Sequence, residues 1–249
     1  MKSWLRHASV LAMTMMFGTV FAQTAPKNAP APGSAEAQVA AKFAERSGGA
    51  KPDQVFKGQA GLFEVLVGSE LYYVDANVNV VIAGPMFDAR TRENLTQKRL
   101  DNALKVDFKS LPLDRAIKTV RGNGSRTIVT FEDPNCPYCK KLWQNMAEMK
   151  DVTIYTFLYP ILSADSNEKS KAIWCAKDRA SVWDAYMVGG KTPASPAGEC
   201  KADALEQNLS LGKSLGINGT PTIIFTDGSR AAGALPVPMI EQRIVSAKK

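Results

Sequence analysis

Two cysteines two residues apart, Cys136 and Cys139, follow one apolar segment of the chain and precede a segment with helical periodicity. The first segment, 127–131, is rich in β-branched residues and is typical of a strand. The second, 140–146, has apolar residues at helical spacing. The pattern therefore predicts a strand that delivers two thiols to the start of a helix. One sulfur can then attack a disulfide of another molecule, and the second can release the first.

The beginning of the chain has the pattern of an export signal. Two basic residues precede the short apolar run 10–17, and residues 20–22 form a plausible cleavage site. The run is too short for a stable membrane span, and a buried N-terminal helix is the alternative. We expect residues 1–22 to be a signal peptide that takes no part in the fold. Residues 23–35, dominated by alanine and proline, are expected to be a disordered leader.

Loss of the signal restricts the chemistry that remains. His7 is the only histidine and lies within the signal, so the mature chain has neither Ser-His or Cys-His catalytic pairs nor histidine-based zinc sites. The signal contains two of the 31 basic residues and none of the 24 acidic ones, which leaves a mild positive charge. We interpret clusters such as Lys140-Lys141 as solvated faces and expect no nucleic-acid partner.

All four cysteines, Cys136, Cys139, Cys175 and Cys200, lie beyond the signal. Export implies an oxidising compartment in which disulfides persist, and an even number fits two pairs. Of the three pairings, the closeness of the first two thiols favours Cys136–Cys139 with Cys175–Cys200. The second pair closes a loop of about 25 residues, worth on the order of 3 kcal/mol in the chain-entropy model. We interpret it as a structural disulfide, and a second redox pair is the alternative.

The segment 36–107 is predicted to be a small β-rich domain. Residues 36–46 have the pattern of a short helix, and 62–67, 71–74 and 78–83 have that of strands separated by turn residues. We expect an antiparallel meander. A domain of this size buries little core, so it is expected to self-associate through a strand edge or an apolar face.

The next segment, 92–121, is charged and has a partial helical stripe. Pro112 is placed near the start of a second predicted helix, and Gly122 and Gly124 are placed at its end. We therefore predict a helical linker over 108–124. The alternative is a core helix of one continuous domain.

Beyond this linker, the segment 125–249 alternates strand and helix patterns. Strands are predicted at 126–131, 152–158 and 221–226, and helices at 136–149, 164–177, 179–188, 203–215 and 237–247. Asp227-Gly228 is a hairpin turn signal. This order predicts an α/β layer fold, and the two thiols after its first strand make it a thioredoxin-like plan with a helical insertion.

The predicted geometry assigns different roles to the two thiols. The nucleophile in disulfide exchange is a thiolate, which unpaired N–H groups at a helix N-terminus stabilise. Cys136 is expected there as the attacking thiol, and Cys139, one turn later and more buried, as the resolving thiol. Pro137 fits the first helical position, where its missing N–H costs nothing. We interpret the neighbouring Glu132 and Asp133 as solvated loop charges, with an influence on the thiols as the alternative.

Two other interpretations of the thiol pair are a zinc site and a permanent disulfide. A zinc site needs four ligands, but Cys175 and Cys200 are the only other thiols and do not form a paired knuckle, so no metal and no cofactor is expected. A permanent disulfide at Cys136–Cys139 would stabilise little, because its loop is so short. A redox-active centre is favoured.

The segment Gly219–Thr222 (GTPT) is the second signal. A proline that opens a strand after Gly-Thr suggests a tight turn with a cis peptide bond, and an ordinary strand-start proline is the alternative. In a thioredoxin plan this turn faces the two thiols and pairs with an extended substrate. We predict substrate contacts at Pro137, Tyr138, Thr220 and Pro221.

Four segments together resemble a known family, the periplasmic disulfide isomerases DsbC and DsbG. They are Phe131–Cys139, Lys171–Asp178, Gly219–Thr222 and, in the N-terminal domain, Gly84–Asp88. The resemblance extends over about 50–249. It implies a V-shaped homodimer joined through the N-terminal domains, with both active sites facing an apolar cleft. It also implies isomerase and chaperone activity on misfolded or misoxidised exported proteins, and a DsbD-type membrane reductase that keeps Cys136 and Cys139 reduced.

The proline of Cys136-Pro137-Tyr138-Cys139 resembles DsbG, whereas the pair Cys175 and Cys200 and the Trp174-Cys175 context resemble DsbC, which is the favoured reading. The substrate class is accordingly either multi-disulfide proteins or single cysteines oxidised to sulfenic acid. The alternatives are a monomeric dithiol oxidase and a secreted holdase in which the disulfides only crosslink.

Overall fold

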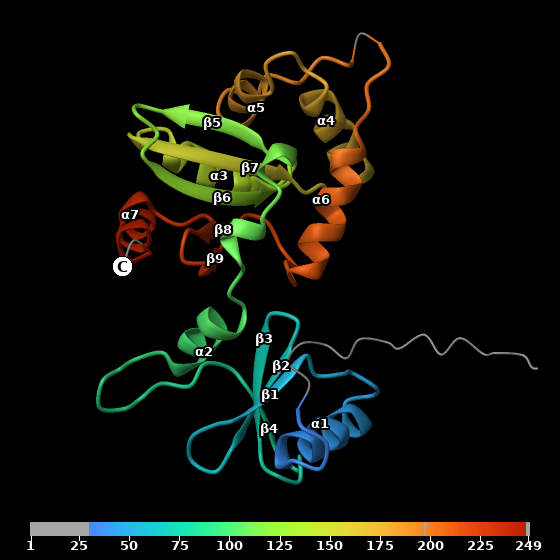
Figure 1. Cartoon of the computed structure of the whole chain (residues 1–249), viewed down its shortest axis with the longest axis vertical. Coiled ribbons are helices and arrows are strands. Elements are labelled where there is room, and N and C mark those ends of the chain that lie inside the picture. The colour runs from blue at the N-terminus through green and yellow to red at the C-terminus, as the bar shows by residue number, and fades with distance from the viewer. Residues whose placement is uncertain (1–29, 197, 248–249) are drawn as a thin grey trace, which may run out of the picture.

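The computed structural model describes residues 30–196 and 198–247 of the chain. The predicted signal peptide over 1–22 and most of the predicted leader lie outside these residues. A smaller N-terminal body and a larger C-terminal body are joined by a connecting segment that contains one short helix (Figure 1).

The N-terminal body is the antiparallel meander expected from the sequence. Its strands are β1 (Gln54–Lys57), β2 (Phe63–Val67), β3 (Glu70–Val74) and β4 (Val81–Ala83), paired in that order. Strand β1 is not among the strands predicted from the sequence. Helix α1 (Ala35–Arg46) packs Val39 and Phe43 against this sheet and is capped by the Ser34 hydroxyl, which accepts a hydrogen bond from Ala37 N at 3.1 Å. Strand β4 pairs only with β3 and therefore forms a sheet edge.

The connecting segment corrects the predicted helical linker over 108–124. Helix α2 (Leu95–Ala103) is present, and two 3₁₀ turns follow at Phe108–Ser110 and Leu113–Arg115. Residues Ile117–Arg121, predicted to be helical, form strand β5. Ile117 and Val120 are three residues apart, which suggested one buried helix face. In the structure only Ile117 is buried, because residues an odd number apart point to opposite faces of a strand, and Val120 is 53% exposed. Antiparallel pairing with the strand at residues 152–158, from Ile117 opposite Thr156 to Arg121 opposite Val152, decided the conformation.

The C-terminal body is a five-stranded mixed sheet in the order β5-β7-β6-β8-β9. Its remaining strands are β6 (Arg126–Glu132), β7 (Val152–Leu158), β8 (Thr222–Phe225) and β9 (Arg230–Ala232). Strands β6 and β7 are parallel, and β8 runs antiparallel to both β6 and β9. The hairpin predicted at Asp227-Gly228 is confirmed: Gly228 has φ +81°, which favours glycine.

Helices cover both faces of this sheet (Figure 1). They are α3 (Pro137–Met146), α4 (Ala164–Trp174), α5 (Arg179–Met187), α6 (Asp203–Ser214) and α7 (Val237–Ser246). Alternation along β6 separates the two cores, since Ile128 packs with α3, α5 and α7 while Val129 packs with residues of α6. The predicted thioredoxin-like layer, with a helical insertion between β7 and β8, is therefore confirmed.

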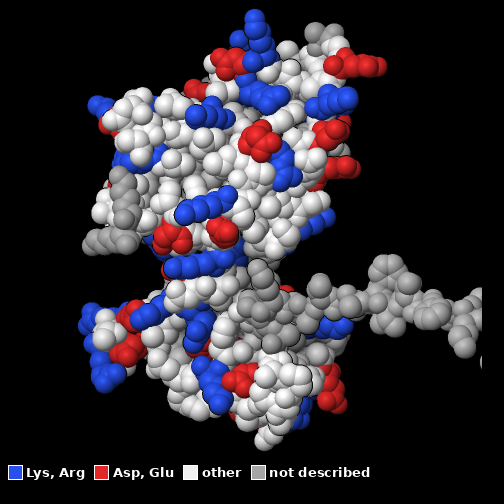
Figure 2. Space-filling model, viewed as in Figure 1, with Lys and Arg blue, Asp and Glu red and all other residues white. Residues whose placement is uncertain are grey.

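The C-terminal body bonds to the N-terminal body through Asn218 Nδ2, which donates to Ser69 Oγ at 3.4 Å, and it bonds to the connecting segment through two further contacts. Arg243 of α7 pairs with Asp101 of α2 at 3.4 Å, and Val106 N donates to Gly228 O at 2.9 Å. On the surface, basic and acidic side chains are interspersed over the face shown in Figure 2. No described helix is long and apolar enough to cross a membrane.

Candidate active site

Strand β6 delivers the two thiols to the start of α3, as the sequence predicts. Cys136 is the N-cap residue of α3, with φ −73° and ψ 117°, and Pro137 occupies the first turn. The backbone closes the turn on both sides: Cys136 N donates to Asp133 O at 3.1 Å, and Lys140 N donates to Cys136 O at 3.1 Å. No side chain caps this helix, so its first N–H groups remain directed toward the position of Cys136.

The two thiols are free and lie in different environments. Cys136 is 4% exposed, whereas Cys139 is fully buried in the core beneath α3. Burial, followed by the nearby Glu132 carboxyl, raises the pKa of the Cys139 thiol well above its ordinary value. Cys139 is therefore held as a neutral thiol, in agreement with its predicted lower ionisation.

The loop before β8 faces the thiols. The Thr220-Pro221 peptide bond is cis, so the reading of an ordinary strand-start proline is wrong. The Cys136 thiol donates a hydrogen bond to Thr220 O, with 3.3 Å between sulfur and oxygen. The structure thus brings Cys136, Cys139, Thr220 and Pro221 together. Tyr138 is 67% exposed next to them.

The interpretation of Glu132 and Asp133 as solvated loop charges is wrong, because both side chains are fully buried. Asp133 accepts hydrogen bonds from Asn135 N at 2.8 Å and Leu162 N at 3.0 Å. Neither carboxyl oxygen of Glu132 has a hydrogen-bond partner among the described residues. Burial accordingly raises the pKa of Glu132 to about 8, which keeps this carboxyl mostly protonated at neutral pH.

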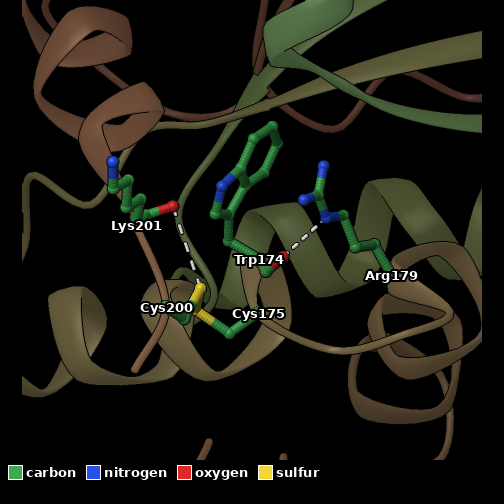
Figure 3. Close-up of a disulfide and its surroundings, with 5 residues drawn as sticks. All are labelled: Trp174, Cys175, Arg179, Cys200 and Lys201. Atoms are coloured by element: carbon green, nitrogen blue, oxygen red, sulfur yellow. Dashed lines mark hydrogen bonds between the residues drawn. A yellow bond between two sulfur atoms is a disulfide. The ribbon is translucent and has the colours of Figure 1, made fainter. Parts of the chain in front are cut away.

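Cys175 and Cys200 form the second predicted pair. Their sulfurs are bonded, with 5.9 Å between the Cα atoms, and the bond ties the C-terminal end of α4 to the segment before α6 (Figure 3). Arg179 covers the preceding Trp174, with its guanidinium carbon 3.7 Å from the ring centroid and its Nε donating to Trp174 O. Among the described residues, no cluster of three or more metal-ligating side chains occurs.

Comparison with known proteins agrees with this geometry. Residues 113–248 match the family described as a thioredoxin-like domain, and residues 28–97 match the disulfide bond isomerase protein N-terminal domain. The chain is 46% identical over 218 residues to the probable thiol:disulfide interchange protein DsbC of Bordetella parapertussis, covering 88% of this chain and 77% of that protein. It is 31% identical over 206 residues to thiol:disulfide interchange protein DsbC of Escherichia coli, covering 80% and 81%. The chain belongs to the DsbC family.

A solved structure supports the same assignment. The disulfide interchange protein from Neisseria gonorrhoeae is 40% identical, with a TM-score of 0.53, and the match covers 56% of this chain and 99% of that one. As a member of the DsbC family, the protein is a thiol:disulfide interchange enzyme with a thioredoxin-like domain.

Three features of this DsbC-family site were missed by the sequence analysis. The first is the burial of Glu132, for which an influence on the thiols was only the alternative, and its place four residues before a cysteine gave no sign of that burial. The second is the pair of exposed apolar side chains Ile161 and Leu162 after β7, and the backbone N–H of Leu162 bonds to Asp133 in the segment before Cys136. The third is Asn135, which directly precedes Cys136. A periodicity analysis finds no such groups, because their environments are built by segments distant in sequence.

Proposed function

We propose that this protein is a periplasmic isomerase and reductase that rearranges or reduces incorrect disulfides in exported proteins. The observation that carries the proposal is the Cys136 thiol at the uncapped start of α3, against the cis-proline loop and backed by the buried Cys139. Attack requires a sulfur that an incoming disulfide can reach, and release requires a second one nearby; Cys136 keeps 4% of its surface exposed, whereas Cys139 keeps none.

The reaction begins when the Cys136 thiolate attacks one sulfur of a substrate disulfide. A mixed disulfide forms, and the other substrate sulfur leaves as a thiolate that takes up a proton. In isomerisation, a different substrate thiolate then attacks the mixed disulfide, which restores Cys136 and leaves a new substrate disulfide. In reduction, Cys139 loses its proton and attacks the Cys136 sulfur of the mixed disulfide. The substrate leaves as a thiolate that takes up a proton, and the enzyme is left with a Cys136–Cys139 disulfide.

Substrate contacts are assigned to Pro137, Tyr138, Thr220 and Pro221. Tyr138 offers an exposed aromatic surface beside Cys136, and the backbone at Thr220 and Pro221 flanks the same sulfur. An extended substrate segment laid along this backbone would be recognised without regard to its sequence. This suits an enzyme whose substrates are diverse misfolded or misoxidised chains.

The partners are a second copy of the chain and a DsbD-type membrane reductase. Val80, Val81 and Ile82 are each about half exposed on or beside the β4 edge, and this apolar edge supports homodimerisation through the N-terminal domains. The reductase would supply the two electrons that return oxidised Cys136 and Cys139 to thiols. The export-signal pattern of residues 1–22 supports the periplasmic location.

The test is recovery of activity from scrambled ribonuclease with catalytic amounts of protein. Wild type should restore activity, and Cys136→Ser should not. Cys139→Ser should retain part of the isomerisation and accumulate mixed disulfides, visible on non-reducing gels, because only release is impaired. Normal recovery with Cys136→Ser would refute the proposal. Alkylation of protein trapped from cells separates an oxidase, which would have no free thiols at rest, from an isomerase, which would have two.

A further inference from the structure

Asn135 lies directly before Cys136, and its side chain is saturated with hydrogen bonds. Its amide nitrogen lies within hydrogen-bond distance of three side-chain acceptors, among which its two N–H groups are shared, and its amide oxygen accepts from two other side chains. The acceptors are Asp165 Oδ2 at 2.7 Å, Ser163 Oγ at 3.2 Å and Ser166 Oγ at 3.2 Å, and the donors are Lys169 Nζ at 2.9 Å and Tyr186 OH at 3.2 Å. Residues 133–136, which join β6 to α3, are called the redox loop here. One side chain of this loop is thus within hydrogen-bond distance of five others.

All five partners belong to the helical insertion. Three lie at the N-terminal end of α4, where Ser163 is the cap residue, Lys169 lies one turn further along α4, and Tyr186 lies in α5. The partners are themselves fixed: Lys169 pairs with Asp165, and Tyr186 is nearly fully buried. The disulfide at Cys175 fixes the other end of α4. Asn135 is therefore bonded to side chains that are carried by α4, its cap residue and α5.

Asp133, at the other end of the redox loop, is also bonded to the segment that begins α4. Asp133 accepts from Leu162 N, directly before the α4 cap, and from the backbone N–H of Asn135 itself. Cys136 has no capping hydrogen bond of its own within α3. Its placement over the first turn therefore depends on the residues that precede it.

We propose that Asn135 is a positioning residue that holds Cys136 at the start of α3 and thereby keeps its sulfur reactive. The inference rests on the proposed role of Cys136 as the attacking thiol. Stabilisation of a negative sulfur by a helix terminus falls off within one turn, so a small displacement of the loop weakens it. The opposite charges of Asp165 and Lys169 balance each other around the amide, so the effect on the sulfur comes from its position.

The test uses a Cys139→Ser background, in which Cys136 is the single free thiol. The rate of alkylation by iodoacetamide is measured from pH 4 to pH 9. Asn135→Ala should slow alkylation at pH 6 by about threefold or more and move the profile to higher pH, because typical helix-terminus effects are of this size. Asn135→Asp should slow it further, since a carboxylate cannot donate to Asp165 and repels it.

Asn145→Ala is the matched control. Asn145 lies in α3, is also half-buried, and donates one hydrogen bond to Leu235 O at 3.1 Å. Its loss should lower the thermal midpoint without altering the alkylation profile. A profile for Asn135→Ala that superimposes on that of its parent would overturn the proposal. If the parent with Asn135 reacts no faster than glutathione, the proposed function fails instead, so the two failures are distinguishable.

Tyr186→Phe provides a second measurement, which remains available if Asn135→Ala does not fold, and the two changes together form a double-mutant cycle where both variants fold. Tyr186→Phe removes only the hydroxyl that donates to Asn135 and should slow alkylation in the same direction. If the effect acts through Asn135, the change should largely vanish in the Asn135→Ala background. No effect of Tyr186→Phe, or a fully additive one, would contradict the inference.

Discussion

Glu132→Gln should change how the stability of this protein depends on pH. The carboxyl is fully buried with no hydrogen-bond partner among the described residues, and burial raises its pKa from 4.5 to about 8. The folded protein therefore binds a proton that the unfolded chain releases between these values. The contribution of this proton to the free energy of unfolding is fully present below about pH 4.5. It falls as the pH rises from this value to about pH 8, and it is absent above that pH.

The size of the effect follows from the shift. At about 1.4 kcal/mol per pKa unit, the change in the free energy of unfolding has a ceiling of about 5 kcal/mol, and water penetration in the folded state reduces it. Glutamine has a similar shape and does not titrate. Its buried amide adds a cost that is the same at every pH, so the difference between variant and parent isolates the ionisation.

Urea unfolding at pH 5, 7 and 9 provides the assay. A parent with Cys136→Ser and Cys139→Ser removes both titrating thiols and keeps the disulfide at Cys175. The stability of Glu132→Gln relative to this parent should rise by several kcal/mol from pH 5 to pH 9. Glu148→Gln, a change at an exposed residue, is the control and should give a flat difference. A flat difference for Glu132→Gln would refute the reasoning, since the folded carboxyl would then ionise as it does in the unfolded chain.

Three further outcomes are expected. In Cys136→Ser, the remaining free thiol Cys139 should resist alkylation at pH 8 until the protein is unfolded, because burial raises its pKa; reaction at the rate of a small thiol would contradict this. Replacing both Cys175 and Cys200 by alanine should cost on the order of 3 kcal/mol in urea unfolding, and an unchanged midpoint would show that the crosslink is not structural. Ile82→Lys at the β4 edge should convert the proposed dimer to a monomer in sedimentation, and a stable dimer would place the interface elsewhere.

Much of the fold was predictable because its signals are local. The order of strands and helices from β6 to α7 followed from short patterns, and the turn at Asp227-Gly228 and the proline after Cys136 needed only their own backbone preferences. The placement of Cys136 at the start of α3 followed from the same local geometry, and its role as the attacking thiol remains a prediction. The predicted homodimer, reductase and substrate contacts remain predictions.

Other features depended on which distant segments meet. Residues Ile117–Arg121 have helical spacing, yet hydrogen bonds to β7 make them a strand. Glu132 and Asp133 look like loop charges, but the sheet and its helices enclose them, and only Asp133 finds partners there. The sequence by itself determined the redox motif and the order of the layers, because these depend on neighbours along the chain. Tertiary structure alone decided which carboxyl is buried without a hydrogen-bond partner among the described residues and which side chains bond to Asn135. Burial and hydrogen bonding of this kind are properties of the assembled fold.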